Sequence, residues 1–259
     1  METKRNLKYF TAKGLSPLTI AGWVVIAIGV ILMAIGGRGL RLYSILGIIV
    51  GAGMLIFSGS GKASGDDIEY QAGEKIKDMI EYGMKRFELF EKHLKYLQPL
   101  TLRGYEFNDQ VYYKKGSDGK NRTSVYSAAV LFFTGERINI HHKHFSFVDE
   151  TIDEELGGSY KYIELDHAEV QSFPFERQIG NRLYKFTDYH FVLFGKDGKE
   201  VFNISVDYGA DIDKACSDIN RIIDIRTKAY YEKLARVEAD RKARLEEAAA
   251  AAAAEGANA

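Results

Sequence analysis

The sequence predicts an α+β protein: an N-terminal apolar helical hairpin, a linking helix, and an antiparallel β domain closed by a C-terminal helix. Three observations lead to this fold class. Residues 17–37 and 42–61 contain no charged residue. Between about residues 100 and 205, apolar side chains recur with the period of two that is typical of strands. From residue 211 onward the spacing changes to that of a helix.

The two apolar runs have the length of membrane-spanning helices, since roughly 20 residues cross the hydrocarbon core of a bilayer. Arg38 and Arg41 lie between the runs. A single continuous span would bury both arginines at the bilayer centre, at about 2.5–3.5 kcal/mol each. A hairpin that turns at residues 36–41 instead places them at the membrane interface, together with Tyr43. We therefore expect a two-helix transmembrane hairpin over residues 17–61.

Three other interpretations of the apolar runs stay open. The first run could be a signal peptide, although no clear small-x-small cleavage site follows it and a second run comes directly after. Both runs could be buried helices of a soluble protein. The pair could also form a shallow re-entrant loop.

The distribution of positive charge predicts the orientation of the hairpin. Residues 1–61 contain six Lys and Arg but only one acid, Glu2. The tail at 1–16 carries four of these cations, and Lys62, Lys75 and Lys77 follow the second run. Positive charge favours the cytoplasmic side of a membrane. We expect a basic cytoplasmic tail at 1–16, a cell-membrane protein with two spans, and both termini in the cytoplasm.

Glycines mark the faces on which the two spans would pack. Gly47 and Gly51 form a small-xxx-small pair, which lets helix backbones approach closely in a membrane. Gly22, Gly29 and Gly36 recur every seven residues on the first span. We expect these faces to pack the hairpin against itself, with dimerisation as the alternative.

Residues 62–98 are expected to form a linker and an amphipathic helix. The segment at 59–67 is a flexible joint that provides an N-cap, and the helix is predicted over 66–97, ended by Pro99. Its apolar residues alternate in steps of three and four. This stripe packs on the adjacent domain or mediates self-association, and its members are Ile76, Ile80, Phe87, Phe90, Leu94 and Leu97.

Residues 99–228 are expected to form the β domain with its closing helix. The predicted strands are 103–115, 123–134, 136–142, 144–148, 160–166, 169–175, 183–194 and 200–206. Asp-Gly pairs at 117–120 and 196–199 predict hairpin turns. Short strands at this spacing indicate a sandwich or a small barrel. Residues 229–259 form a charged, Ala-rich helical tail that is expected to fray near its end.

Three segments of the β domain resemble bacterial pleckstrin-homology-like (PH-like) and GRAM-like domains. AAVLFFTGERINIHH at 128–142 is similar to their strand-turn-strand unit, YIELDHAEVQSF at 162–173 to the next element, and FVLFGKDGKEVFNI at 191–204 to their late hairpin. The resemblance covers roughly residues 100–228. It implies a β-barrel closed by a helix, next to transmembrane helices in many bacterial members.

The same resemblance suggests a lipid-binding loop. In these families the first hairpin turn often contacts anionic headgroups, and here it is flanked by Lys114, Lys115, Lys120 and Arg122. Each Lys or Arg near an anionic leaflet contributes about 1 kcal/mol. A solvated hairpin tip is the alternative, since Asp118 reduces the positive charge of the turn.

Histidines 141, 142 and 144 invite a zinc interpretation, because imidazole is a frequent zinc ligand. Alternation along a strand would let His142 and His144 share a face and turn His141 away. Neither an HExxH motif nor a cysteine pair accompanies them, so we expect a solvated strand edge and no metal cofactor. The acidic segment at 149–155 lacks the glycine and ordering of a calcium loop.

The sequence contains none of the common catalytic motifs: no GxSxG, no P-loop and no dinucleotide-binding glycines. Its formal net charge of −1 and the lack of a basic stripe predict no nucleic-acid partner. The function predicted is a non-enzymatic, membrane-anchored scaffold that presents the β domain to a protein partner or forms a homo-oligomer. The alternatives are an anionic-lipid-sensing module and a metal-dependent enzyme that uses the histidines.

Overall fold

A computed structural model describes residues 2–12, 17–36, 38–59, 62–94, 97–179 and 182–257 of the chain. Inside these ranges, the side chains of residues 38, 58, 59, 179, 182 and 249–257 are not described. The chain forms two compact units. Unit 1 contains residues 1–77, 105–126 and 144–154, and unit 2 contains residues 78–104, 127–143 and 155–259.

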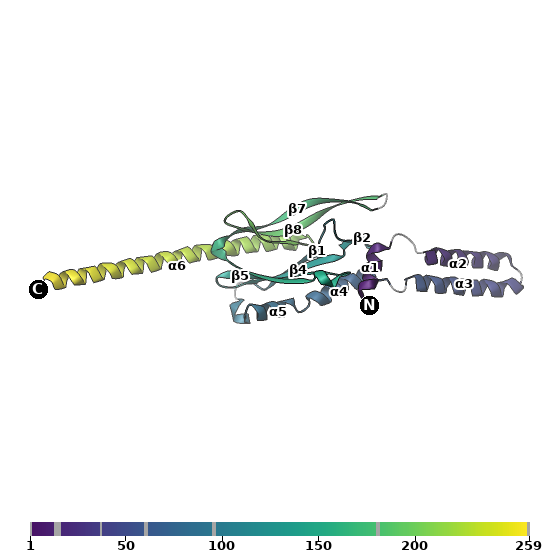
Figure 1. The fold of residues 1–259 in the computed structure, drawn as a ribbon, viewed down its shortest axis with the longest axis horizontal. Coiled ribbons are helices and arrows are strands. Elements are labelled where there is room, and N and C mark those ends of the chain that lie inside the picture. The colour runs from purple at the N-terminus through teal and green to yellow at the C-terminus, as the bar shows by residue number, and fades with distance from the viewer. Residues whose placement is uncertain are drawn as a thin grey trace. The chain divides into compact units, whose positions relative to one another are not determined.

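The described residues of unit 1 form four α-helices, drawn at the purple and blue end of the chain in Figure 1. They are α1 (Glu2–Thr11), α2 (Pro17–Ile35), α3 (Arg38–Gly59) and α4 (Gly65–Ile76). Helices α2 and α3 lie side by side as a hairpin. Ser64 caps α4 as the sequence predicts: its hydroxyl accepts from the Asp67 N–H at 3.0 Å, and the Asp67 carboxylate accepts from the Ser64 N–H at 2.7 Å.

Helix α1 was not expected, because residues 1–16 were predicted as a basic tail. Its Tyr9 and Phe10 are buried in an aromatic cluster with Tyr105, Tyr126 and Phe147. The Phe10 and Phe147 rings stack with their centroids 6.4 Å apart. The basic residues of α1 occupy its exposed face, so the segment is an amphipathic helix that contributes to the core of unit 1.

The single helix predicted over 66–97 is wrong. The structure has α4, then α5 (Met79–Arg86), then a 3₁₀ turn, η1 (Glu91–His93). Helix α5 ends in a Schellman motif, in which the Glu88 N–H donates to the Lys85 carbonyl and the Leu89 N–H donates to the Met84 carbonyl. Glu88 occupies the left-handed position with φ 53°, where glycine is usual. Because no glycine stands at 88, the sequence pattern did not reveal this helix end.

The strands that the structure describes form three sheets. One has four strands in the order β1 (Leu100–Tyr105), β4 (Val125–Phe133), β5 (Arg137–Ser146), β6 (Glu154–Lys161). The second has three antiparallel strands in the order β7 (Leu165–Ile179), β8 (Arg182–Gly195), β9 (Glu200–Ser205). The third is a small ribbon of β2 (Tyr113–Lys115) and β3 (Asn121–Thr123). The predicted α+β class with antiparallel sheets and a C-terminal helix is confirmed.

A closed barrel is not formed by the residues that the structure describes. Strand β6 ends at Lys161, and the 3₁₀ turn η3 (Tyr162–Glu164) carries the chain from the four-stranded sheet to the three-stranded one. The sheets therefore remain separate hydrogen-bonded units, and side chains fill the space between them. The predicted closed barrel is therefore wrong: the structure has two separate sheets whose side chains share one core.

Several strand boundaries differ from the predicted ones. The segment 103–115 contains the end of β1, an irregular stretch and β2, whereas 136–142 and 144–148 join as the single strand β5. The acidic segment at 149–155 forms a 3₁₀ turn, η2 (Glu150–Ile152), and then the start of β6. Both predicted Asp-Gly turns are confirmed, with Gly119 at φ 80° and Gly198 at φ 76°.

The core of unit 2 lies between its two sheets and α6 (Ala210–Ala257). Alternate residues of β4 and β5 enter it, as do Phe191 and Leu193 from β8 and Ile219 and Ile223 from α6. The opposite face of β4 and β5 carries Phe132, Asn139 and His141, and α5 packs there. A Cβ atom at Gly83 of α5 would lie 2.5 Å from Phe132, so this glycine permits the close approach.

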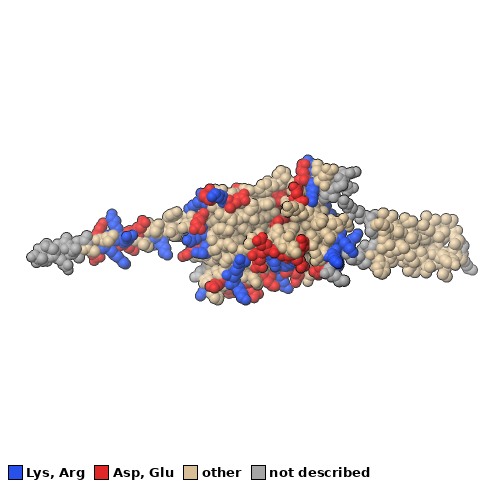
Figure 2. Space-filling view, viewed as in Figure 1, with Lys and Arg blue, Asp and Glu red and all other residues tan. Residues whose placement is uncertain are grey.

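Two elements of unit 2 extend past its core. The β7–β8 hairpin continues beyond β9, because β9 pairs only with residues 190–194 of β8 while β7 pairs with β8 out to Arg182. Helix α6 is described as helical through Ala257, and its side chains from Lys228 to Ala248 are exposed. Figure 2 shows blue and red side chains interspersed along this part of α6.

Candidate functional site

The α2–α3 hairpin exposes large apolar side chains along both helices. Both helices are long and apolar enough to cross a membrane. In the most apolar stretch of each helix, only 11% of the residues are buried. Ile56 and Phe57 are each 73% exposed, and the visible hairpin surface in Figure 2 carries no charged side chain. Leaving this area in water is costly, at about 25 cal/mol for each Å² of apolar surface.

Glycines form the contact between α2 and α3. A Cβ atom at Gly51 would lie 2.7 Å from the Ile26 side chain and 2.8 Å from the Gly22 carbonyl oxygen. Gly29 faces Ser44 and Ile48 in the same way. At Gly47 an added Cβ would lie 4.0 Å from the Gly29 Cα, so this position faces α2 but leaves room. The small residues thus let the hairpin backbones approach. Ile26 and Ile48 pack in this contact, whereas many other large apolar side chains of the two helices are exposed.

Both ends of the hairpin return to the same core. Before it, α1 buries Tyr9 and Phe10; after it, Ala63, Ile68 and Ala72 bury in the same cluster. The Ala63 N–H donates to the Arg5 carbonyl at 3.3 Å, so the residues directly after α3 pair with α1. Residues 2–11 and 63–76 therefore lie in one compact body.

The predicted interfacial residues lie near the turn of the hairpin. Arg41 and Tyr43 are exposed on the first turns of α3. Arg38 begins α3, but its side chain lies outside the described residues. Arg41 and Tyr43 are thus available to an interface at this end of the hairpin.

Arg122, predicted as a lipid contact, is instead buried in unit 1 with 1% exposure. Its guanidinium pairs with both Asp118 oxygens, at 2.9 and 2.6 Å, and with Glu69 of α4 at 2.9 Å. The hydrogen bond from Arg122 holds the pKa of the Asp118 carboxyl well below its usual range. Arg122 therefore joins the β2–β3 ribbon to α4, and a lipid headgroup cannot reach it.

The three predicted lysines have different surroundings. Lys114 donates to the Tyr9 carbonyl at 2.6 Å and lies over the Tyr9 ring, 4.6 Å from its centroid. Burial lowers the pKa of Lys114, and the nearby Lys62 lowers it further. Lys115 and Lys120 are exposed. Lys115 and Lys120 are thus open to solvent, whereas Lys114 is held against α1 beside Lys62.

His141, His142 and His144 lie in different environments. His141 is buried in unit 2, with Nε2 3.4 Å from Glu155, whereas His144 belongs to unit 1 and its Nδ1 lies 2.7 Å from Glu106. His142 packs edge-on against Phe202. Among the described residues, no group of three or more His, Cys, Asp or Glu is placed to hold a metal ion.

The residues of the predicted self-association stripe do not form one continuous surface. Ile76 packs in the core of unit 1, and Leu97 packs against the core of unit 2. Phe87 lies against Phe132, with ring centroids 6.3 Å apart. Ile80 and Phe90 are exposed, and Leu94 is half-buried. The break after Ile76 and the turn at Glu88 remove the continuous helix on which the stripe depended.

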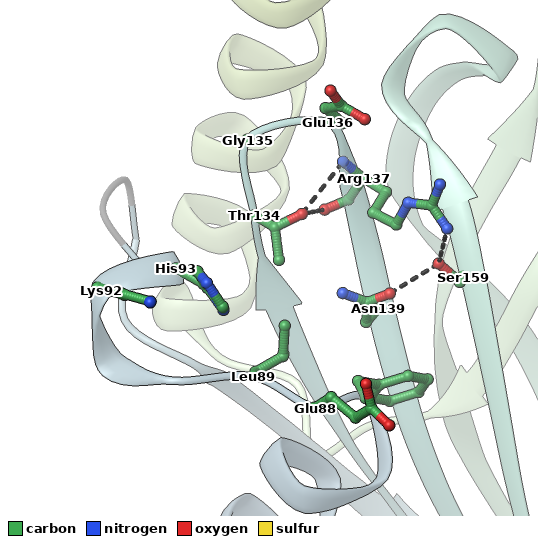
Figure 3. A pocket seen from close by; sticks show the side chains of 11 residues that line it. Glu88, Leu89, Lys92, His93, Thr134, Gly135, Glu136, Arg137, Asn139 and Ser159 are labelled. Carbon is green, nitrogen blue, oxygen red and sulfur yellow. Dashed lines mark hydrogen bonds between the residues drawn. The ribbon is translucent and has the colours of Figure 1, made fainter.

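An open pocket of about 720 Å³ lies on the outer face of the four-stranded sheet in unit 2, beside the end of α5. Figure 3 shows its floor: Arg137 and Asn139 of β5 and Ser159 of β6. Arg137 donates to the Ser159 hydroxyl at 3.2 Å, and this hydroxyl donates to Asn139 Oδ1 at 2.7 Å. Sequence reasoning missed this pocket, because its wall is the segment after Glu88 that was predicted to be helical.

A second groove of about 490 Å³ runs along α6 in the same unit. Ile163, Tyr230, Leu234 and Val237 supply apolar surface, and Lys161 and Lys233 supply positive charge. Gly135 and Glu136 border both cavities, so the β4–β5 turn separates them. These residues belong to the stretch on which the PH-like resemblance rests.

Comparisons with known proteins identify no relative of this chain: no family model matches it, and no curated protein or solved structure matches it.

Proposed function

We propose that this protein is a membrane-anchored, non-enzymatic interaction protein, in which the α2–α3 hairpin holds the two sheets and α6 next to a membrane. The observation that carries this proposal is the exposed apolar hairpin with both ends in one core. Residues 2–11 and 63–76 must lie on the same side of a membrane because they pack together. The hairpin between them then crosses twice or not at all, and its length and exposure favour two crossings.

The proposed interaction role rests on surfaces of unit 2. The proposal draws on the resemblance of residues 100–228 to PH-like domains, in which a β domain is followed by a helix. Two open cavities flank the β4–β5 turn, and α6 presents exposed Tyr231, Leu234 and Val237. Tethering to a membrane raises the local concentration of a membrane partner, so modest intrinsic affinity is sufficient. The protein acts as a scaffold or as a subunit of a membrane assembly.

The topology is tested with single cysteines in a Cys216→Ser background. Lys8→Cys and Lys214→Cys report on α1 and α6, and Gly39→Cys reports on the hairpin turn, where an added side chain meets open space. A membrane-impermeant maleimide is expected to label positions 8 and 214 from the cytoplasmic side and position 39 from the other. Labelling of all three from one side, or extraction of the protein by alkaline carbonate, contradicts the two-span anchor.

The interaction role is tested by crosslinking the intact protein in its native membrane, followed by purification in mild detergent and native mass spectrometry. A stoichiometric protein partner, or a defined homo-oligomer, is the expected result. A lipid-bound monomer as the sole species contradicts the scaffold role and favours the second function below.

The second candidate function is contact with anionic lipid, favoured by the cations around α1. Lys4, Arg5 and Lys8 are exposed on this helix, and Lys62 and Lys114 lie near each other beside it. The test compares hydrogen exchange of α1 in nanodiscs with and without phosphatidylglycerol. Anionic lipid is expected to increase protection in the wild type but not in Lys4→Glu/Lys8→Glu, with Lys214→Glu/Lys228→Glu on α6 as the charge-matched control.

A further inference from the structure

Helix α6 carries one face that begins in the core of unit 2 and continues beyond it. Ile223 packs in this core, and the Thr227 hydroxyl donates to a backbone carbonyl of η3 at 3.2 Å. The same face then continues, in steps of three and four residues, with Tyr230, Leu234 and Val237. The apolar face of the helix therefore extends past the contact that holds the helix to the core.

The continued face is open to solvent. Tyr230 is 45% exposed, Leu234 42% and Val237 56%. The opposite side of the helix carries only Lys, Arg, Glu and Ala, at positions 228, 229, 232, 235, 236 and 239. A narrow apolar stripe on a helix with charged flanks is the pattern by which one helix pairs with another.

The groove of about 490 Å³ lies along this stripe. Tyr230, Leu234 and Val237 line it from α6, and Ile163 of η3 lines its other wall. A second helix laid on the stripe would therefore contact the wall of the groove as well as α6. The groove is thus part of the surface that a partner helix covers.

We propose that a second copy of this chain covers the stripe, with the two α6 helices packed antiparallel. The inference rests on the proposed interaction role and names the partner. If Leu234 lies opposite the second copy's Val237, Tyr230 lies opposite the second copy's Arg241, and a guanidinium over a tyrosine ring is a favourable contact. Two-fold symmetry makes each of these contacts twice.

The charges beside the stripe favour this arrangement. In the same register Lys233 lies beside the second copy's Asp240. Arg226, which lines the groove, lies beside the second copy's Glu247. A parallel pair would instead place Arg241 against the second copy's Arg241 in the seam, where like charges repel. Charge complementarity therefore selects an antiparallel second copy.

The first test is the mass of the purified full-length protein in detergent, measured by light scattering over a range of protein concentrations. A dimer that dissociates on dilution is expected. Val237→Lys places a charge in the seam and is expected to raise the dissociation constant roughly tenfold or more. Ile225→Lys makes the same change on the opposite side of α6, where Ile225 is 57% exposed, and is expected to leave the constant within about twofold.

The second test is a charge exchange that determines the direction of pairing. Lys233→Glu and Asp240→Lys are each expected to weaken the dimer about tenfold, and the double variant is expected to restore it to within about threefold. In a parallel pair Lys233 would lie beside the second copy's Glu238, so Lys233→Glu/Glu238→Lys would be the variant that restores it.

The proposal is overturned if the protein is monomeric at all concentrations, if Val237→Lys and Ile225→Lys weaken the dimer equally, or if only the exchange with Glu238 restores it. A different protein partner captured in the native membrane, with a monomer after purification, would overturn this inference and leave the proposed scaffold role standing. Cysteine labelling measures the membrane anchor separately from both.

Discussion

The Asn6 side chain of α1 donates a hydrogen bond to the Phe147 carbonyl at 2.9 Å, joining positions 141 residues apart in the sequence. Asn6 is 2% exposed, and its amide also pairs with Gln71 of α4 at 2.7 Å. This relationship fixes the N-terminal helix to the same body as the residues that follow the hairpin. A direct contact of this kind is stronger support for placing both ends of the hairpin on one side of a membrane than the distribution of Lys and Arg along the sequence.

Asn6→Ala is expected to loosen α1. The change leaves the Phe147 carbonyl buried without its partner, which costs about 1–3 kcal/mol. Hydrogen exchange should show faster exchange across α1 while the amides of β8 and α6 in unit 2 keep their protection. Asn108→Ala, at an exposed position, is the control. Unchanged protection of α1 in Asn6→Ala would contradict its role in docking this helix.

Gly51→Ile is expected to separate the two helices of the hairpin, because even a Cβ at this position lies 2.7 Å from Ile26. Overpacking of this kind typically costs about 1–3 kcal/mol. Gly53→Ile is a matched control, since the same helix leaves open space there. The measurement is the free energy of unfolding of the full-length protein in detergent, which should fall only in the Gly51 variant.

Arg122→Leu is expected to destabilise unit 1. It leaves the Asp118 and Glu69 carboxylates without their shared cation, and breaking a buried pair costs about 3–5 kcal/mol. Because both carboxylates are more than a third exposed, solvent screens them after the substitution and we expect a smaller loss than for a fully buried pair. Arg221→Leu breaks an exposed pair with Asp218 on α6 and should change the free energy of unfolding by less than about 0.5 kcal/mol. Denaturant titration in detergent measures both, and equal losses would argue against the buried network.

His141 and His144 are expected to respond to pH in opposite directions. The hydrogen bond with Glu106 raises the pKa of His144, so its stabilisation is present below about pH 6.5 and is lost as the pH rises through the raised pKa. Burial lowers the pKa of His141, so the folded state loses stability as the pH falls below about 6.5.

Histidine NMR titration of the full-length protein should place the midpoint of His144 above that of His141. Glu106→Gln is expected to lower the midpoint of His144 and to leave His141 unchanged. A common midpoint for the two rings would contradict the different environments that the structure gives them.

Glu88→Gly is expected to stabilise unit 2, because Glu88 occupies the left-handed conformation at φ 53° that glycine adopts without strain. The strain at such a position is about 1–2 kcal/mol, and part of the gain is offset by the greater entropy of glycine in the unfolded chain. We expect a gain of about 1 kcal/mol in thermal or denaturant unfolding. Glu91→Gly, two residues beyond the turn in η1, should give no gain.

The sequence alone determined the elements that local patterns specify. Two uncharged runs of membrane-spanning length, divided by Arg38 and Arg41, predicted the pair of apolar helices. Period-two apolar residues predicted most strands, and Asp-Gly pairs predicted the turns at Gly119 and Gly198. These features depend on neighbours within a few residues, and such neighbours are visible in the sequence.

Only the tertiary structure decided that α1 docks in the core of unit 1, that the helix after the hairpin is broken, and that Arg122 is buried. The aromatic residues of α1 are buried by side chains more than 90 positions away, and Arg122 finds Glu69 at a separation of 53 residues. The end of α5 at Glu88 carries no glycine signal, and the pocket beside it exists because β5 and β6 bring Asn139 and Ser159 together. Local propensity cannot encode these neighbours, since the free energy that selects them comes from burial and hydrogen bonding between distant segments.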